Sequence, residues 1–438
     1  MPTATTEQLI ALAKAAAAEA ADYQERFGAE DTEARKIVDV IENFLRVTGR
    51  VVYGGAAINA HMPADKRFYD PSLYLPDYDF MTPDPIQDCA DIIVAFHDEG
   101  FTDVEAKFGI HEGTYKIFVN YRPAADITFM PPDIYKRVVS DAALIDGIQY
   151  ASVNFLRMNI YLELSRPAGD VKRWEKVYER LLLLNSVVPL RAGRCTKDPI
   201  GALASDDDTD THSRKNGVTE MVLHDRIVGA GIAANAIFLS GIAYLHDLQP
   251  DTDEVVMMMS DRVAPLRNDL KLLGLRVTEF PALGELLPAR TEFRTARKRL
   301  VAVVFETVAC HAYTILREPA GYRLGSLDLL IQMYYAMYFA ELQGYLPVRL
   351  LCVIQELIDM EATRRQTAVV KGEPAHEVFP LECLGHQPSL PELKKAHRER
   401  VREKQKELRR VLRKSQSQSR SHSGVRLTKK QKRRRRSQ

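Results

Sequence analysis

The chain has 438 residues, of which 46% are hydrophobic, so it can bury a sizeable core and is long enough for two or more domains. This composition excludes a disordered, collagen-like or small disulfide-stapled protein. The net charge of +1 hides an asymmetry, because residues 391–438 hold 20 Lys or Arg against 4 Asp or Glu. A body of net −15 therefore precedes a tail of net +16, which indicates a polyanion or an acidic surface as partner.

The cysteines are far apart in the sequence, odd in number and contain no CxxC pair. They are Cys89, Cys195, Cys310, Cys352 and Cys383. This pattern argues against a disulfide framework or a cysteine-rich zinc site, and it favours a reducing compartment.

No membrane partner is expected. The N-terminal segment is rich in alanine and has no basic region, so it does not resemble a secretory signal. Residues 227–245 are apolar and long enough to test as a membrane span. Their glycines, alanines and polar Asn235 and Ser240 favour a buried helix instead.

The first half of the chain alternates helical and strand-like patterns. Apolar spacing and turn residues predict a helix at 6–26, broken near Gly28, and a second from Asp31 or Thr32 to Gly49. A strand at 51–53, a helix after Gly54 and Gly55 and an irregular segment at 63–76 come next. The alternating run PDYDFM then predicts a short strand, and a helix follows at 85–99. Strand candidates follow at 101–107, 114–121 and 125–130. This order is typical of an α/β or α+β sheet domain.

The second half is less regular. Residues 152–186 are predicted to be helical with a break at 167–169, and a polar, acidic linker follows at 191–217. A second unit begins at about 218 and mixes helices with short strands, of which 299–307 is the clearest. From 392 the sequence is basic and can form a solvated helix, whereas SQSQSRSHSG and KKQKRRRR are expected to be disordered when unbound.

Three aspartates and a glycine pair suggest phosphoryl-transfer chemistry. Asp77 and Asp79 are two residues apart, so on a strand their carboxylates leave the same face and can share a hard cation. Gly54 and Gly55 open a helix upstream, where bare backbone N–H groups can hold a triphosphate. Asp126 stands among apolar strand residues, so it requires a metal or a cationic partner.

Three acids around two divalent ions would activate a 3′-hydroxyl and stabilise a leaving pyrophosphate. On these residues alone, a glycine turn with unrelated solvated acids explains the pattern equally well.

Longer motifs add a resemblance. YGGAAIN, LPDYDFMTP, VEAKFGIHEGTYKIFVNY, ADITFMPP and NFLRMNIYLELSRPAGDVKRWEKVYERLLLLN closely resemble the poly(A) polymerase catalytic subunits of the large nucleocytoplasmic DNA viruses, a branch of the DNA polymerase beta-like nucleotidyltransferases. The resemblance spans about residues 35–190. It implies template-independent addition of AMP from ATP to RNA 3′ ends with two Mg²⁺ or Mn²⁺ ions.

By position, the resemblance assigns the family's functional residues. Asp77, Asp79 and Asp126 are the catalytic and metal-binding acids, and Asp126 is also the candidate general base. Gly54 and Gly55 bind the nucleotide. One departure is the long segment HMPADKRFYDPSLYL between the glycines and the first acid, which looks like an insertion of the viral branch.

The resemblance also implies the architecture: an α+β protein whose nucleotidyltransferase fold is a mixed sheet flanked by helices. We expect a catalytic domain at 1–190, the acidic linker at 191–217, a degenerate nucleotidyltransferase-like domain at 218–385 and a basic, largely disordered tail at 386–438. The best-matching piece of the second module is YRLGSLDLLIQMYYAMYF.

Basic residues in or just after the catalytic segment are candidates for neutralising the triphosphate and RNA. The nucleotide-binding candidates are Lys107, Arg166 and Arg173; Lys116, Arg157, Lys172 and Lys176 are further candidates for either ligand. Trp174 and Tyr161 could stack a base, but lone aromatic residues on helices are more often part of the core.

Two motifs are decoys. GAGIAA at 229–234 imitates a dinucleotide-binding turn but lacks a preceding strand and a suitably placed acid, so it indicates helix packing. DDDTDTH at 206–212 imitates a calcium loop but has Thr211 where glycine is needed.

The favoured function is thus an RNA 3′-adenylyltransferase with ATP and an RNA 3′ end as partners. Alternatives are a nucleotidyltransferase with another nucleotide or acceptor, and an inactive RNA-binding virion protein. The basic tail favours RNA contact through counterion release, although a nuclear localisation signal and a solubilising end are open alternatives. The resemblance alone implies a homodimer and a place in the virion and host cytoplasm.

Overall fold

The computed structural model describes residues 5–69, 76–190, 192, 195, 214–215, 218, 236–240, 255–284, 286–316, 322–342, 347–403 and 406. By its internal contacts the chain forms two compact units. One lies within residues 1–107 and 115–387, and the other lies within 108–114 and 388–438.

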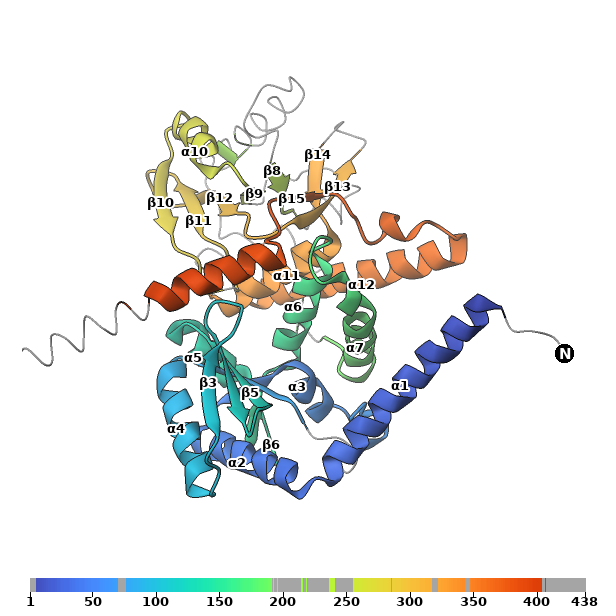
Figure 1. Ribbon diagram of the computed structural model, residues 1–438. Coiled ribbons are helices and arrows are strands. Elements are labelled where there is room, and N and C mark those ends of the chain that lie inside the picture. The colour runs from blue at the N-terminus through green and yellow to red at the C-terminus, as the bar shows by residue number, and fades with distance from the viewer. Residues whose placement is uncertain are drawn as a thin grey trace, which may run out of the picture. The chain divides into compact units, whose positions relative to one another are not determined.

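The first unit begins with two helices, α1 (Thr6–Glu30) and α2 (Thr32–Thr48) (Figure 1). The Asp31 carboxylate accepts hydrogen bonds from the backbone N–H groups of the first turn of α2, which confirms it as the cap. Gly49 ends α2 with a left-handed φ of 63°. The expected break near Gly28 is wrong, because α1 continues to Glu30; one glycine costs a helix only about 1 kcal/mol.

The first sheet is mixed, as expected, and has seven strands in the order β3-β4-β5-β2-β1-β7-β6. Its strands are β1 (Val51–Tyr53), β2 (Tyr78–Thr82), β3 (Val104–Phe108), β4 (Thr114–Val119), β5 (Arg122–Phe129), β6 (Ala143–Ile145) and β7 (Ile148–Tyr150). β1 pairs antiparallel with β2 and parallel with β7, and β2 pairs parallel with β5. The sequence predicts all but β6 and β7.

Short helices surround this sheet. They are α3 (Gly54–Ala60), η1 (Ala64–Lys66), α4 (Pro85–Asp98), α5 (Pro132–Asp141), α6 (Val153–Leu164), η2 (Val171–Arg173) and α7 (Trp174–Val187). The predicted break between α6 and α7 is confirmed at the turn that contains Pro167 and Gly169. α5 was not predicted.

The second sheet has eight strands in the order β10-β11-β12-β9-β8-β14-β13-β15. Its strands are β8 (Ala236–Phe238), β9 (Val256–Ser260), β10 (Arg276–Phe280), β11 (Arg290–Arg294), β12 (Leu300–Glu306), β13 (His311–Leu316), β14 (Tyr322–Gly325) and β15 (Cys383–Leu384). The accompanying helices are α10 (Val263–Lys271), α11 (Leu327–Phe339), α12 (Pro347–Lys371) and η4 (Ala375–Glu377). β12 confirms the strand predicted at 299–307.

The helix expected at 227–245 is wrong where the structure describes it, because β8 is a strand there. Ala236, Ile237 and Phe238 are at most 4% exposed, and a short apolar run buried on both faces has no periodicity that separates strand from helix. Among the described residues, no helix has the length and apolarity needed to cross a membrane.

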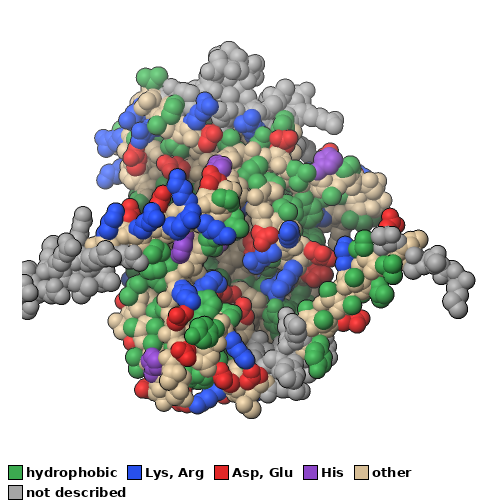
Figure 2. Space-filling model, in the orientation of Figure 1, with side chains coloured by type: hydrophobic (Ala, Val, Ile, Leu, Met, Phe, Trp, Pro, Cys, Tyr) green, Lys and Arg blue, Asp and Glu red, His purple; other side chains and the backbone are tan. Residues whose placement is uncertain are grey.

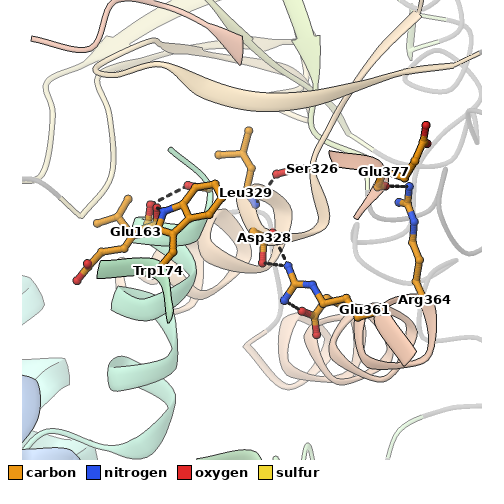
Figure 3. A network of polar contacts seen from close by, with 11 residues as sticks. Glu163, Trp174, Ser326, Asp328, Leu329, Glu361, Arg364 and Glu377 are labelled. Carbon is orange, nitrogen blue, oxygen red and sulfur yellow. Dashed lines mark hydrogen bonds and ion pairs between the residues drawn. The ribbon is translucent and has the colours of Figure 1, made fainter. Parts of the chain in front are cut away.

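One continuous core joins the two sheets within this unit. Every residue of α11 is buried, and the helix packs against α6, where the rings of Phe155 and Phe339 meet edge to face at 5.2 Å. Arg365 of α12 forms a buried ion pair with Asp328 of α11, at 2.8 Å, and another with Glu361 (Figure 3). The predicted module boundaries stay predictions, since most of 191–217 and both decoy motifs lie outside the described residues.

Four cysteines contradict the expectation of reduced thiols. Cys195 is bonded to Cys352 and Cys310 to Cys383, with Cα–Cα distances of 5.7 and 5.3 Å. The partners are 157 and 73 residues apart in the chain, so linear spacing does not reveal their proximity. Cys89 is buried and free.

The second unit contains a basic helix. Residues 390–403 are helical, and Ser389 bonds to Glu392 at its start. Arg400 donates to the Ile110 carbonyl oxygen at 2.9 Å. Its exposed basic residues are Lys394, Lys395, Arg398 and Arg402, and Lys and Arg side chains gather over this helix in Figure 2. The helix at 390–403 agrees with the solvated helix expected from 392. Both stretches expected to be disordered lie outside the described residues.

Candidate active site

The structure brings the three predicted acids together at the centre of the first sheet. Asp77 immediately precedes β2, and Asp79 lies within it, two residues on and therefore on the same face. Asp79 is in register with Asp126 on the neighbouring parallel strand β5. Three carboxylates thus lie side by side on two adjacent strands.

Burial and neighbouring charges make Asp77 and Asp79 hard to ionise. Burial is the main reason that the pKa of Asp79 is raised to about 7, and the charges of Asp77 and Asp126 raise it further. The pKa of Asp77 is raised as well, first by burial and then by Asp126. A site that holds like charges in this way is suited to a cation.

Asp126 has the cationic partner that its apolar surroundings require. Lys116 of β4 forms an ion pair with it. The same lysine lowers the pKa of both Asp77 and Asp79, so it lies close enough to act on the whole acidic group.

Gly54 and Gly55 lie directly against this group. Gly54 has a φ of +72°, and a Cβ built on it would stand 2.7 Å from Oδ2 of Asp79. A Cβ on Gly55 would stand 3.3 Å from both terminal nitrogens of Arg180. Glycine at these positions lets the backbone approach an acid on one side and a guanidinium on the other.

Carboxylates are the donors that Mg²⁺ and Mn²⁺ prefer, so Asp77, Asp79 and Asp126 fit such ions by chemistry and charge. In the described part of the chain, however, no three acidic, histidine or cysteine side chains already form a set that could hold an ion. Asp126 is engaged by Lys116 instead. The metal-binding role of the acids stays a prediction.

The predicted basic residues fall into two groups. Arg173 lowers the pKa of Asp79, and Lys176 lowers that of Asp77, so both lie near the acids. Lys107 instead pairs with Glu105 at 2.5 Å and lies over the Phe118 ring. Its role in nucleotide binding stays untested.

Two other predicted arginines lie beside the second sheet or in the core. Arg166 acts electrostatically on His311 of β13, whose pKa it lowers together with burial. Arg157 is 1% exposed and donates to the Asn185 side chain at 2.8 Å and to the carbonyl of Val188, so it does not reach a ligand. Lys172, in η2, is exposed.

The aromatic candidates for base stacking belong to the core. Trp174 donates its indole N–H to the Glu163 carbonyl oxygen at 3.1 Å and packs against Phe379 (Figure 3). Tyr161 is 0% exposed. Both core interpretations are confirmed.

Sequence reasoning missed Arg180. It lies in α7, beside Gly55, and donates to the Tyr69 hydroxyl at 2.9 Å. In the apolar run around it, this arginine looks like an ordinary surface charge. The available signal was its spacing from Lys176 on the same helix and from Arg173 just before it, which places the three on one side.

A cavity of about 440 Å³ lies elsewhere in this unit. It is lined by residues of α2 and α3 and by Tyr78 and Tyr150. Tyr78 is adjacent to Asp77 and Asp79 on β2, and therefore its side chain leaves the opposite face of the sheet. This cavity is separate from the acids.

The mixed sheet agrees with a nucleotidyltransferase-like fold. The acid pair at β2, the third acid on β5 and the glycine turn lie where the sequence predicts the site. Residues 39–170 match the family "Poly(A) polymerase catalytic subunit". The resemblance drawn from the sequence is confirmed over this segment.

Relatives share the same segment. A protein of Acanthamoeba polyphaga mimivirus, named "Putative poly(A) polymerase catalytic subunit", is 34% identical over 163 residues, covering 36% of this chain and 27% of that protein. A protein of the same name from African swine fever virus (strain Badajoz 1971 Vero-adapted) is 22% identical over 168 residues, covering 37% of this chain and 35% of that protein. The matched segment thus spans about a third or less of each relative.

A solved structure confirms the fold over almost the whole chain. The Megavirus polyadenylate synthase crystal structure superposes with a TM-score of 0.75 at 19% sequence identity, covering 93% of this chain and 85% of that one. The similarity therefore includes the second sheet, which the family match at 39–170 does not reach.

Proposed function

We propose that this protein is a template-independent poly(A) polymerase, which transfers AMP from ATP to the 3′-hydroxyl of RNA. The observation that carries the proposal is the grouping of Asp77, Asp79 and Asp126 on two adjacent strands beside the Gly54–Gly55 turn. All of these residues lie in the segment that matches the poly(A) polymerase catalytic subunit family.

In the proposed reaction the 3′-oxygen of RNA attacks the α-phosphorus of ATP and pyrophosphate leaves. Two bound Mg²⁺ or Mn²⁺ ions would supply charge neutralisation at the attacking and leaving oxygens. Asp77 and Asp79 would hold the ions. Asp126 would join them by exchanging its Lys116 partner and would accept the hydroxyl proton as general base.

We propose RNA as the partner of the basic helix 390–403. Its exposed Lys394, Lys395, Arg398 and Arg402 present positive charge, which attracts a phosphate backbone without sequence preference. From the resemblance, we also propose a homodimer that acts in the virion and host cytoplasm.

The reaction is tested by extending a labelled RNA primer with each nucleoside triphosphate separately, in Mg²⁺ or Mn²⁺. The variant is Asp77→Ala combined with Asp79→Ala, and the matched control is Asp133→Ala, whose carboxylate is 99% exposed. ATP-specific extension that the double variant abolishes and the control keeps supports the proposal. Extension with a nucleotide other than ATP would refute the proposed specificity for ATP. The absence of extension with any triphosphate would refute the polymerase activity.

The RNA-binding helix is tested by the salt dependence of primer binding. Counterion release predicts that neutralising four phosphate-contacting cations reduces the slope of log K against log salt by about 3 to 4. The variant changes Lys394, Lys395, Arg398 and Arg402 to Gln. An unchanged slope would exclude this helix from the RNA-binding surface.

A further inference from the structure

One face of α7, together with the residue before it, carries positive charge along the acidic site. Lys176 and Arg180 of α7 are four residues apart, and Arg173, at the end of η2, precedes Lys176 by three, so the three side chains follow one side of the helix. Seven residues of helix rise about 10 Å, which is comparable to the length of an extended triphosphate.

This face lies beside both the acids and the glycine turn. Arg173 and Lys176 act electrostatically on Asp79 and Asp77 respectively. At the other end, both terminal nitrogens of Arg180 lie 3.3 Å from the place of a Cβ on Gly55. The face therefore runs from the reacting centre to the turn.

Arg180 is held in place by an aromatic hydroxyl and an aromatic ring. Its guanidinium donates to the Tyr69 hydroxyl at 2.9 Å and lies 4.8 Å from the centre of the Phe68 ring. Asn59 fixes these two aromatic residues, because its Oδ1 accepts hydrogen bonds from both of their backbone N–H groups at 3.0 Å. The local geometry is thus set before any ligand arrives.

Arg173 and Arg180 differ in their partners. Arg173 is paired with the Glu163 carboxylate at 3.3 Å. Within the described residues, no carboxylate lies within ion-pair distance of Arg180. A fixed guanidinium beside a glycine turn, with no described carboxylate in direct contact, presents a fork of N–H donors suited to phosphate oxygens.

We propose that Arg180 binds the β- and γ-phosphates of the incoming nucleoside triphosphate, with Lys176 contacting the phosphates between it and the acids. The proposal rests on the function proposed above, which places the α-phosphate at Asp77 and Asp79. The pyrophosphate portion then extends along α7 and reaches Arg180. Arg173, held by Glu163, positions the near end of this face.

The kinetic test compares Arg180→Gln and Arg180→Lys with the wild type in primer extension. Loss of a charged hydrogen bond to phosphate should raise KM for ATP by about 10- to 100-fold in Arg180→Gln. KM for the RNA primer should stay the same, and Arg180→Lys should recover part of the loss. The matched control is Lys136→Gln, which removes a 79% exposed charge from α5. An unchanged KM for ATP, or a change in the RNA KM alone, overturns the proposal.

A binding test separates this proposal from the activity itself. Inorganic tripolyphosphate is titrated calorimetrically into the full chain, with Arg180→Gln and Tyr69→Phe as variants. We expect Arg180→Gln to lose most binding and Tyr69→Phe, which keeps the ring but not the hydroxyl, to lose about threefold.

Binding that depends on Arg180 in a protein that extends no primer refutes the polymerase activity and supports the phosphate site. Equal binding by wild type and Arg180→Gln overturns the phosphate site even if the protein polyadenylates RNA. If Arg180→Gln fails to fold, Arg180→Lys and Tyr69→Phe decide, and wild-type affinity in both overturns the proposal.

Discussion

The substitution Asp79→Asn should stabilise the protein at alkaline pH when metal is absent. Asp79 has a native pKa of about 7, against 3.8 for the ordinary carboxyl group, mainly because of burial and then because of Asp77 and Asp126. Between these two values the native state keeps a proton that the unfolded state has released. The free energy of unfolding of the wild type must therefore fall as pH rises through this range.

The magnitude follows from the same two pKa values. They differ by about 3 pH units, and each unit corresponds to about 1.4 kcal/mol, so full ionisation costs the native state at most about 4 kcal/mol. Partial exposure of the side chain reduces this to about 2 to 3 kcal/mol. Asparagine has the same shape and no charge, so it should remove the cost.

The assay is urea unfolding of wild type and Asp79→Asn in a metal chelator, at about pH 5 and about pH 8. The variant should be more stable than the wild type by about 1 kcal/mol at pH 5, where the unfolded carboxyl group is already mostly ionised, and by about 2 to 3 kcal/mol at pH 8. Saturating Mg²⁺ or Mn²⁺ should narrow the gap by stabilising the wild type alone. A variant that is less stable than the wild type at both pH values would refute this account of the acidic group.

Two further substitutions test the glycine turn and the buried arginine. Gly54→Ala should reduce the rate of primer extension by at least about 100-fold, because its Cβ would meet Asp79 at 2.7 Å. The control is Gly100→Ala, which is also at positive φ but has open space around it; it should lose about 1 kcal/mol of stability and no activity. Arg157→Leu should lower the free energy of unfolding by about 2 to 4 kcal/mol because the carbonyl of Val188 loses its donor. KM for ATP should stay unchanged. A raised KM for ATP in a variant of wild-type stability would show that Arg157 contributes to nucleotide binding.

Local sequence patterns predicted the parts of the fold that local forces determine. The Asp31 cap, the Gly49 terminus and the strands that carry Asp79 and Asp126 are each set by neighbours within a few residues.

Features that depend on distant residues were not predictable in this way. Cys310 meets Cys383 only because β13 and β15 are adjacent strands, 73 residues apart in the chain. β8 was read as helix because burial on both faces removes the periodicity that tells strand from helix. Arg180 lacked a local signal of function, since its neighbours Gly55 and Tyr69 are brought to it by the fold.

The long segment between the glycine turn and the first acid gains a structural role through Arg180. In the sequence it is only a departure from the spacing of the wider superfamily. In the structure, Phe68 and Tyr69 of this segment contact the guanidinium, and Asn59 of α3 fixes their backbone. The segment therefore connects the helix after the glycine turn to α7. Shortening it would remove the partners of Arg180 while leaving all three acids on their strands, so the acids and the proposed phosphate contact are separable in this protein.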